Sequence, residues 1–563
     1  MTRMDPRLKG SRLPNPSVLS YHLNSSLQNQ QGFEDIQTFY PGMGVLCNLK
    51  KAPEEDLWFD HSLRIRELVA QDTQKSSGRV SLRIERNSGE TGIDIQDISG
   101  FRKITHLLDP VRWIQGKYSL PKHAYLPWHQ DSWESTWNKL QDPMNQAYVE
   151  AVACYAFSRL RESDISPHFH FFYGAFCGKA NTYAYNITDT YMSFRHNRWF
   201  WTGQEKNLFK LSFDESIPDE VKEALLHQPE ELDDSSDEES DASEEELKGL
   251  DCDITDAKSI HSAGGSAFES ADEDSDETEE TDETEETDED DEDLEIFAEI
   301  KNFPVMMMYT ESSEGTMDDL LDDYETVGSK PGTKKWELTW KAWIFQIIAA
   351  LSAAQTIFGF THNDLHSNNI VWINTDKEFF WYKTNDGIYF QVPTFGKIFR
   401  IIDFGRAVFK INDNLFYSDD FKPGNDAAEQ FNFADFVDES EPEIHPNPSF
   451  DLSRFTVSVF ESLFPESPPV TKTKKVLSEE PDLVIYETQS DLYNLMWSWL
   501  LCDDGHNVLI DPDGSERYPN FDLYKVITNE VHTAVPSEQI RKPAFQCFRS
   551  KEPVNEKVYS LFC

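Results

Sequence analysis

Cysteine is scarce in this chain and follows no pairing pattern. The seven cysteines are scattered over 563 residues, and no two of them form a C-x-x-C pair. This distribution argues against a disulfide scaffold and against a thiolate zinc site. It favours a reducing, intracellular and cytoplasmic location, where free thiols persist.

Positive charge is also scarce. Lys and Arg together number 51 against 102 Asp and Glu, and residues 231–295 alone carry −30 of the formal charge of −51. A chain without a basic excess lacks the electrostatic footprint that binds nucleic acid or anionic membranes, so we expect neither as a partner. The acidic stretch has few apolar residues to bury, which predicts a disordered insertion over residues 229–297. Its charge makes basic proteins candidate partners.

A long uninterrupted apolar run is missing. The segment from Ala342 to Phe360 comes nearest, but Gln346, Ser352 and Gln355 interrupt it. A membrane span needs roughly 20 apolar residues with few polar ones. We therefore predict a buried core helix here.

Two short motifs in the C-terminal half point to phosphoryl transfer. Residues 362–369 read H-N-D-L-H-S-N-N, and a D-F-G turn begins at Asp403, thirty-four residues after Asn369. Phosphoryl transfer depends on positioning groups and neutralising charge. In this pattern Asp364 would accept or orient the proton of an incoming hydroxyl, while Asn369 and Asp403 would hold magnesium on the nucleotide phosphates. We therefore expect ATP and Mg²⁺ as cofactors.

These motifs resemble the catalytic loop and the metal-binding turn of the protein-kinase superfamily. The resemblance implies an α+β, two-lobed protein-kinase-like fold that the long acidic disordered insertion interrupts. Residues 450–460 resemble the helix whose opening aspartate, here Asp451, braces the catalytic loop from beneath. His362 would support the backbone of the same loop.

The region before the acidic insertion resembles the smaller lobe of a kinase. Alternating apolar residues predict strands over 80–84, 93–98 and 101–108, with a glycine turn between the first two and a second turn at Ser99–Gly100. By resemblance, Gly89 and Gly92 would approach the phosphates and Lys103 would bind the nucleotide. Three other lysines remain open as alternatives to Lys103, namely Lys117, Lys122 and Lys139. A plain β-hairpin explains the two glycines equally well.

An amphipathic helix predicted over residues 145–160 resembles the kinase helix that supplies a glutamate partner to this lysine. Glu150 is the candidate partner. After the acidic insertion, a buried strand over 303–311 precedes a helix that begins within residues 314–321. Glu311 is the candidate hinge residue, whose backbone would meet adenine.

These assignments divide the chain into five parts. They are an N-terminal extension (1–75), the first part of the kinase N-lobe (76–228), the acidic insertion (229–297), the end of the N-lobe with the hinge and the start of the C-lobe (298–330), and the rest of the C-lobe (331–563).

The catalytic loop departs from the common H-R-D-L-K-x-x-N pattern at two positions. Asn363 replaces an arginine that would clamp an activation-loop phosphate, so activation by that route is not expected. His366 replaces the usual lysine, as in small-molecule kinases of the aminoglycoside and choline kinase type and in haspin. A β-hairpin insert over residues 379–399 is also similar to haspin, and no A-P-E motif closes the activation segment.

The whole arrangement resembles the serine/threonine kinases of iridoviruses and related large DNA viruses. That resemblance implies a viral protein kinase acting on serine or threonine in the host cytoplasm or packaged in virions. Two alternatives remain open. One is a small-molecule kinase, suggested by His366, and the other is a pseudokinase scaffold that binds basic proteins through the acidic tract.

Overall fold

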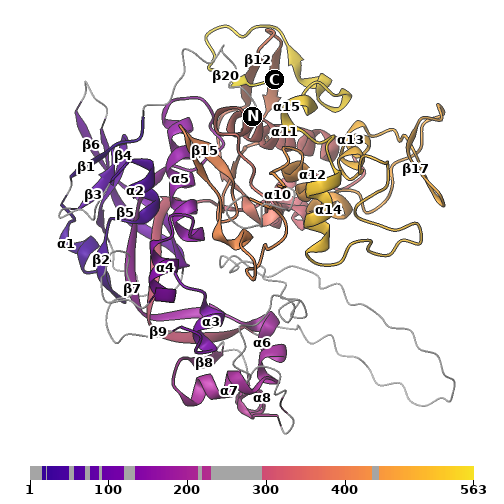
Figure 1. Ribbon diagram of the computed structural model, residues 1–563. Helices are drawn as coiled ribbons and strands as arrows, with labels where there is room; N and C mark the ends of the chain where they lie inside the picture. The colour runs from indigo at the N-terminus through magenta and orange to yellow at the C-terminus, as the bar shows by residue number, and fades with distance from the viewer. Residues whose placement is uncertain are drawn as a thin grey trace, which may run out of the picture.

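The N-terminal half of the chain builds one large sheet, and the C-terminal half builds a mainly helical body beside it (Figure 1). The computed structural model describes residues 15–20, 22–49, 56–69, 77–87, 92–118, 134–213, 218–229, 232, 295–433 and 443–563. The chain is thus a mixed α/β protein. Most of the predicted acidic insertion lies outside the described residues, so its disorder stays a prediction.

The large sheet has seven antiparallel strands, and the acidic insertion interrupts it. Its main path runs β2 (Phe33–Gln37), β7 (Phe172–Asn186), β9 (Ile296–Glu311), β6 (Ile93–His106), β5 (Gly78–Asn87) and β4 (Leu63–Leu68), while β8 (Lys210–Phe213) pairs with β9. Strand β9 follows the insertion in sequence, yet it lies between β6 and β7, which precede it. The two flanks of the insertion therefore belong to one folding unit.

The predicted N-terminal extension is wrong as a separate part, because residues 15–69 contribute strands. Strand β2 pairs with β7, β4 pairs with β5, and a short pair joins β1 (Val18–Ser20) to β3 (Leu57–Phe59). The register of β4 shifts between Ile65 and Glu67. Such a bulge breaks the period-two alternation that identifies a strand in a sequence.

The turn predicted at Ser99–Gly100 is also wrong, because β6 runs through it as one strand. Gly100 pairs with Val80 on one side and Glu311 on the other. A Cβ on Gly100 would collide with the Leu82 side chain and lie 3.1 Å from the Thr310 carbonyl oxygen. Glycine here permits close packing inside a strand.

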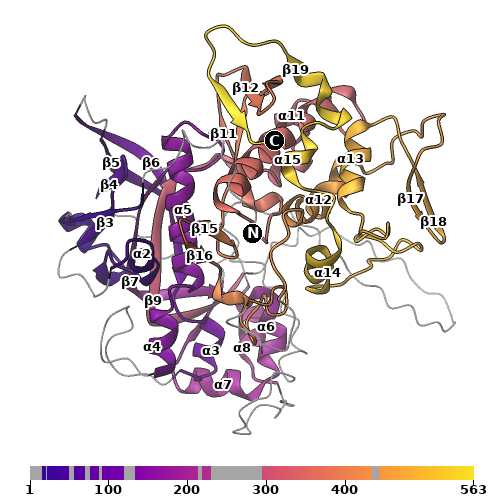
Figure 2. The same cartoon turned by 45° about the horizontal axis from the view of Figure 1, so that its top comes forward.

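Helix α5 (Gln146–Glu162) confirms the helix predicted over 145–160 and lies between the sheet and the helical body (Figures 1 and 2). The Asn145 side chain caps it by accepting from the Ala147 N–H at 3.2 Å. Tyr148 stacks on Tyr40, which precedes α2 (Pro41–Leu46), with ring centroids 5.9 Å apart. Burial on nearly every side fixes the position of α5, and with it any side chain that α5 presents to the site.

Helix α11 (Lys334–Phe358) is the core of the helical body. Thr333 caps its start, and Gly359 ends it in the left-handed conformation. It is long and apolar enough to cross a membrane, but 78% of its apolar window is buried inside the protein. The predicted core helix is confirmed. Around it lie α12 (Phe450–Leu463), α13 (Asp491–Trp499), α14 (Asp522–Glu530) and α15 (Pro536–Gln539).

The helical body also contains two small sheets and two strand pairs, β15 (Phe409–Ile411) with β16 (Asn414–Phe416) and β17 (Val476–Glu480) with β18 (Leu483–Tyr486). One small sheet contains β10 (Gly315–Thr316), β11 (Ile370–Asn374) and β14 (Lys397–Ile401), and the other contains β12 (Phe379–Thr384), β13 (Tyr389–Pro393), β19 (Arg549–Ser550) and β20 (Val558–Leu561). The predicted hairpin insert is present as β12 and β13. The helix expected to begin within residues 314–321 is present as α9 (Asp319–Asp322), which follows β10 and precedes α10 (Tyr324–Val327).

Candidate active site

The H-N-D-L-H-S-N-N loop is held from below by one buried carboxylate. Asp451, in the first turn of α12, accepts hydrogen bonds from the backbone N–H groups of His362 and Asn363, each at 3.0 Å. Asn363 takes a positive φ of 65°, a conformation that non-glycine residues adopt rarely. The predicted contact between Asp451 and the loop is thus present.

His362 supports the loop from a second direction. Its ring Nε2 bonds the Ile402 carbonyl oxygen at 2.8 Å, directly before Asp403. Its ring also packs against Phe404, with centroids 5.7 Å apart. His362 therefore ties the first motif to the second, which fits the structural role predicted for it.

Asp364 is a buried carboxylate surrounded by donors and positive charge. Its Oδ1 accepts from the Tyr524 hydroxyl at 2.9 Å, and its Oδ2 lies 3.8 Å from an Arg406 guanidinium nitrogen. Burial by itself would raise the pKa of Asp364, but the Arg406 guanidinium holds that pKa well below its usual range. Asp364 is therefore ionised at neutral pH, as a proton acceptor must be.

Asn369 uses its amide nitrogen within the loop. That nitrogen donates to the Asp364 carbonyl oxygen at 3.0 Å and lies 3.0 Å from the His366 ring nitrogen Nε2. This arrangement leaves the amide oxygen as the atom suited to a cation. Burial lowers the pKa of His366 to about 4, so its imidazole is neutral at pH 7 and supplies no positive charge.

Lys103 joins the sheet to the second motif. Its Nζ lies 2.8 Å from Glu150 Oε1 on α5 and 2.7 Å from Asp403 Oδ2. These partners are 47 and 300 residues away in the sequence. The predicted Lys103–Glu150 pair is present. Of the rival lysines, Lys117 is exposed, Lys139 pairs with Asp419, and Lys122 lies outside the described residues.

The three charged groups of this cluster, Lys103, Glu150 and Asp403, shift one another's pKa values. Burial would lower the pKa of Lys103, but Asp403 and Glu150 raise it above its ordinary value. Burial would raise the pKa of Asp403, and Lys103 holds it below the usual range. Burial raises the pKa of Glu150, against the opposing effect of Lys103. Lys103 is therefore the cation that keeps two buried carboxylates close together.

The D-F-G turn is positioned by its contacts with α5. Asp403 takes a positive φ of 63°, and Phe404 packs against Phe157 of α5 with centroids 4.6 Å apart. A Cβ on Gly405 would lie 3.0 Å from the Gln146 side chain at the start of α5. The D-F-G turn therefore packs closely against the start of the helix that carries Glu150.

Gly92, one of the two glycines predicted to approach the phosphates, is not at this site. Gly92 precedes β6, while Lys103 lies eleven residues further along at the opposite end of that strand. At about 3.4 Å per residue the two are roughly 35 Å apart. Gly89 lies outside the described residues. Lys103 lies instead beside the β4–β5 connection, because Arg102 pairs with Gly78 and Ile104 N–H bonds Ser77 Oγ at 2.9 Å.

Glu311 was predicted as a hinge residue, and its backbone N–H and its carboxylate are both engaged within the protein. Its backbone N–H donates to the Phe171 carbonyl oxygen at 3.1 Å and is not available to adenine. Its carboxylate pairs with Arg161 and, at 2.6 Å, with Arg400. Burial would raise the pKa of Glu311, but Arg400 and Arg161 lower it to about 2. Glu311 is a buried ion-pair centre at the end of β9.

Several residues at the site carry no motif and were missed from the sequence. Tyr524 comes from α14, 160 residues beyond Asp364, and no local pattern marks it. Arg406 lies 3.8 Å from both Asp364 and Asp420. Because it directly follows D-F-G in the sequence, it could have been predicted as a site residue. Asp419, next to Asp420, pairs with Lys139 near the start of α5.

Together these side chains could orient a hydroxyl, hold a divalent cation and bind a phosphate chain. They converge from β6, α5, the loop after α11, the D-F-G turn and α14. No protein-family model matches the chain, and no curated protein matches its sequence.

Proposed function

We propose that the protein is an ATP-dependent phosphotransferase, a serine/threonine protein kinase with a two-lobed protein-kinase-like fold. The observation that carries this proposal is the position of Lys103 Nζ, 2.8 Å from Glu150 and 2.7 Å from Asp403. A lysine on a sheet, a glutamate on the adjoining helix and a D-F-G aspartate form the phosphate-binding cluster of protein kinases. Sequence spacing alone does not bring these three residues together.

The arrangement of elements supports the same fold. A sheet with one adjoining helix, α5, faces a helical body in which α11 leads into the loop of Asp364 and α12 braces it. The insertion interrupts the sheet without dividing it. These features are expected of an N-lobe and a C-lobe with the catalytic groups between them.

Each residue then has a defined task. Asp364 accepts the proton of the acceptor hydroxyl and orients that hydroxyl toward the γ-phosphate. Lys103 binds the phosphate chain of ATP, and Glu150 holds Lys103 in place. Asn369 and Asp403, which offer oxygen ligands, would hold Mg²⁺, and the cation would neutralise phosphate charge when bound. Arg406 keeps Asp364 ionised.

Neutral His366 has a consequence for catalysis. A lysine at this position would place a full positive charge near the transferred phosphate, and an imidazole with a pKa of about 4 does not. More of the charge stabilisation must then come from Lys103 and the cation. The residue does not distinguish a protein acceptor from a small one, so the acceptor class has to be measured.

The test is a phosphotransfer assay of the full chain with labelled ATP and Mg²⁺. Mixed proteins, aminoglycosides, choline and sugars serve as separate acceptor pools. We expect labelled serine and threonine, and Asp364→Asn should lower the rate about 10²–10⁴-fold. Asp522→Asn, an exposed carboxylate on α14, is the matched control and should keep wild-type activity. Equal activity in wild type and Asp364→Asn would refute the assignment, and labelling of small molecules alone would refute the protein acceptor.

A further inference from the structure

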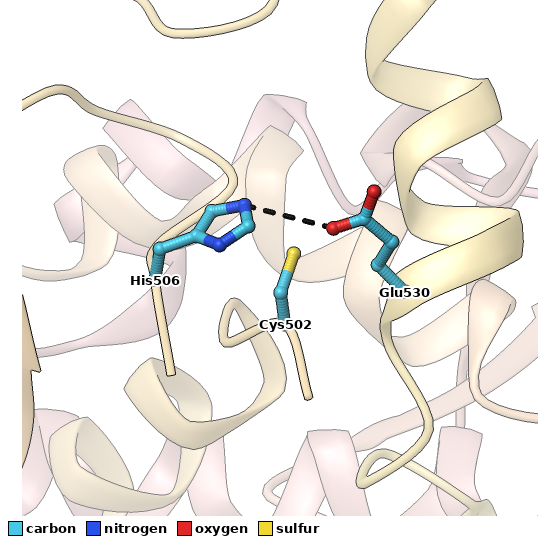
Figure 3. A group of neighbouring side chains, drawn as sticks. All are labelled: Cys502, His506 and Glu530. Atoms are coloured by element: carbon cyan, nitrogen blue, oxygen red, sulfur yellow. Dashed lines mark ion pairs between the residues drawn. The ribbon is translucent and has the colours of Figure 1, made fainter. Parts of the chain in front are cut away.

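A second cluster of chemically reactive side chains lies in the helical body, between the end of α13 and the end of α14. Cys502, His506 and Glu530 point toward one another there (Figure 3). Their ligand atoms, one sulfur, one imidazole nitrogen and one carboxylate oxygen, all lie within 4.8 Å of one another. None of these residues has a role in the proposed phosphotransfer.

The backbone brings the three residues together. A tight turn places Cys502 and His506 side by side, since the Cys502 N–H donates to the His506 carbonyl oxygen at 2.8 Å. Gly505 permits this turn with a φ of 96°. The Asp503 N–H donates to the Glu530 carbonyl oxygen at 2.8 Å, which fixes the turn against the last residue of α14.

The geometry is close to that of a tetrahedral metal site. His506 Nε2 and Glu530 Oε2 are 3.8 Å apart. Zinc bonds of about 2.0–2.3 Å at tetrahedral angles place neighbouring ligand atoms about 3.4–3.6 Å apart. Small side-chain rotations would therefore bring all three ligands onto one ion. Cys502 is buried, while the Glu530 side chain is 47% exposed and leaves a path for entry.

A carboxylate outside the cluster orients the histidine. Asp504 Oδ1 bonds His506 Nδ1, and Nε2 faces the cluster 3.0 Å from the Tyr518 hydroxyl. A carboxylate that accepts from Nδ1–H leaves the lone pair on Nε2, the form in which imidazole binds metals. Metal-binding histidines are commonly held by such a carboxylate partner.

We propose that Cys502, His506 and Glu530 form a zinc-binding site. A thiolate and an imidazole favour Zn²⁺ over the harder Mg²⁺ or Ca²⁺, which prefer all-oxygen sites. Binding releases the Cys502 thiol proton to solvent, and water fills the fourth position. The sequence had argued against a thiolate zinc site, because it contains no C-x-x-C pair. In the structure, two of the ligands come from one turn and the third comes from the end of a helix distant in sequence.

The site would couple to the proposed active site through α14. This consequence rests on the proposed function, whereas zinc binding itself does not. Zinc would tie the Cys502–His506 turn to Glu530 at the end of the helix whose Tyr524 donates to Asp364. Loss of the metal should loosen α14 and thereby the position of Asp364.

The experiment measures metal binding to the full chain, independently of activity. Metal-free protein in excess Mg²⁺ is titrated with Zn²⁺ against a chromophoric chelator, and with Co²⁺ to detect thiolate-to-cobalt absorption. We expect one tight zinc ion for each chain, a thiolate band with Co²⁺, and a raised melting temperature. Cys502→Ser should remove the band and weaken zinc binding about 100-fold, and Asp504→Asn should weaken it about 10–100-fold.

Variants of exposed residues outside the cluster serve as controls for the zinc titration. Cys547→Ser and His532→Ala replace an exposed cysteine and an exposed histidine and should bind zinc as the wild type does. Glu530→Gln, at a half-exposed position, replaces Cys502→Ser if the latter does not fold by circular dichroism. Absence of tight zinc binding in the wild type, or equal binding in the wild type and the folded ligand variants, would overturn the site. Phosphotransfer by the metal-free protein is measured separately, so failure of the zinc site and failure of the proposed function are distinguishable.

Discussion

The two sides of the candidate active site are assembled in different ways. On the helical side, one loop carries His362, Asp364 and Asn369, and the Asp451 carboxylate on α12 accepts hydrogen bonds from the backbone N–H groups of His362 and Asn363. On the sheet side, Lys103 and Glu150 come from different elements and meet across an ion pair. The first side depends on the conformation of one braced loop, and the second depends on how the sheet and α5 pack. Variants on the two sides should therefore fail in different ways.

The largest expected effect on activity concerns the sheet side. Lys103→Met should lower phosphotransfer about 10²–10³-fold, because a preorganised charge on the phosphates is lost and two buried carboxylates are left without their shared cation. The measurement is kcat and KM for ATP. Lys117→Met, which removes an exposed lysine, is the control and should stay within about twofold of wild type. Comparable losses in both variants would show that Lys103 has no special role.

Variants on the helical side of the site should lower the stability of the protein. Asp451→Ala removes the acceptor of two buried N–H groups and should lower the free energy of unfolding by about 2–4 kcal/mol. The measurement is the melting temperature, together with activity at a temperature where the variant is folded. Asp491→Ala, an exposed first-turn aspartate of α13, should change the melting temperature little. An unchanged melting temperature for Asp451→Ala would mean that the loop does not need its brace.

Tyr524 tests whether the helical side also positions the catalytic carboxylate. Tyr524→Phe removes the hydroxyl that donates to Asp364 Oδ1 and should lower kcat about tenfold, the equivalent of about 1.4 kcal/mol. KM for ATP should not change, because within the described residues the Tyr524 hydroxyl bonds Asp364 and Arg454 and neither Lys103 nor Asp403. A rise in kcat would instead show that the hydroxyl obstructs the acceptor.

A smaller, pH-dependent effect is expected where the segment after D-F-G meets Lys139. Burial, with Asp426 and Asp419, raises the pKa of Asp420 to about 7. A carboxyl whose folded pKa is raised stabilises the fold below its unfolded pKa, and this contribution is lost as pH rises through about 7. The melting temperature should therefore fall between about pH 4 and pH 7, and Asp420→Asn should flatten that decline. Identical pH profiles would refute the shift.

The difference between the helical side and the sheet side also explains which features of the site the sequence could predict. The spacing of Asp364, Asn369 and Asp403 identified the helical side because one loop and one turn set their geometry. The pairing of Lys103 with Glu150 was predicted only by resemblance. The phosphate role of Gly92 and the separate extension before residue 76 were wrong, because strand pairing decides them. Strand pairing also uses the backbone N–H of Glu311, which the sequence did not indicate. Tyr524 lies too far along the chain for any spacing rule to connect it with Asp364.

The smallest effect is expected at the glycine turn that the sequence pattern favoured. Gly92→Ala should leave phosphotransfer within about twofold of wild type and cost about 1–2 kcal/mol, because a φ of 94° strains a residue with a Cβ although open space surrounds the new methyl group. Gly100→Ala, within β6, should be far worse, because its methyl group would meet Leu82 and the Thr310 carbonyl oxygen three residues before Lys103. Activity and melting temperature of both variants provide the comparison. Loss of activity in Gly92→Ala with unchanged stability would indicate that this turn binds the phosphates. The expected pattern would instead support phosphate binding near Lys103, beside the β4–β5 connection.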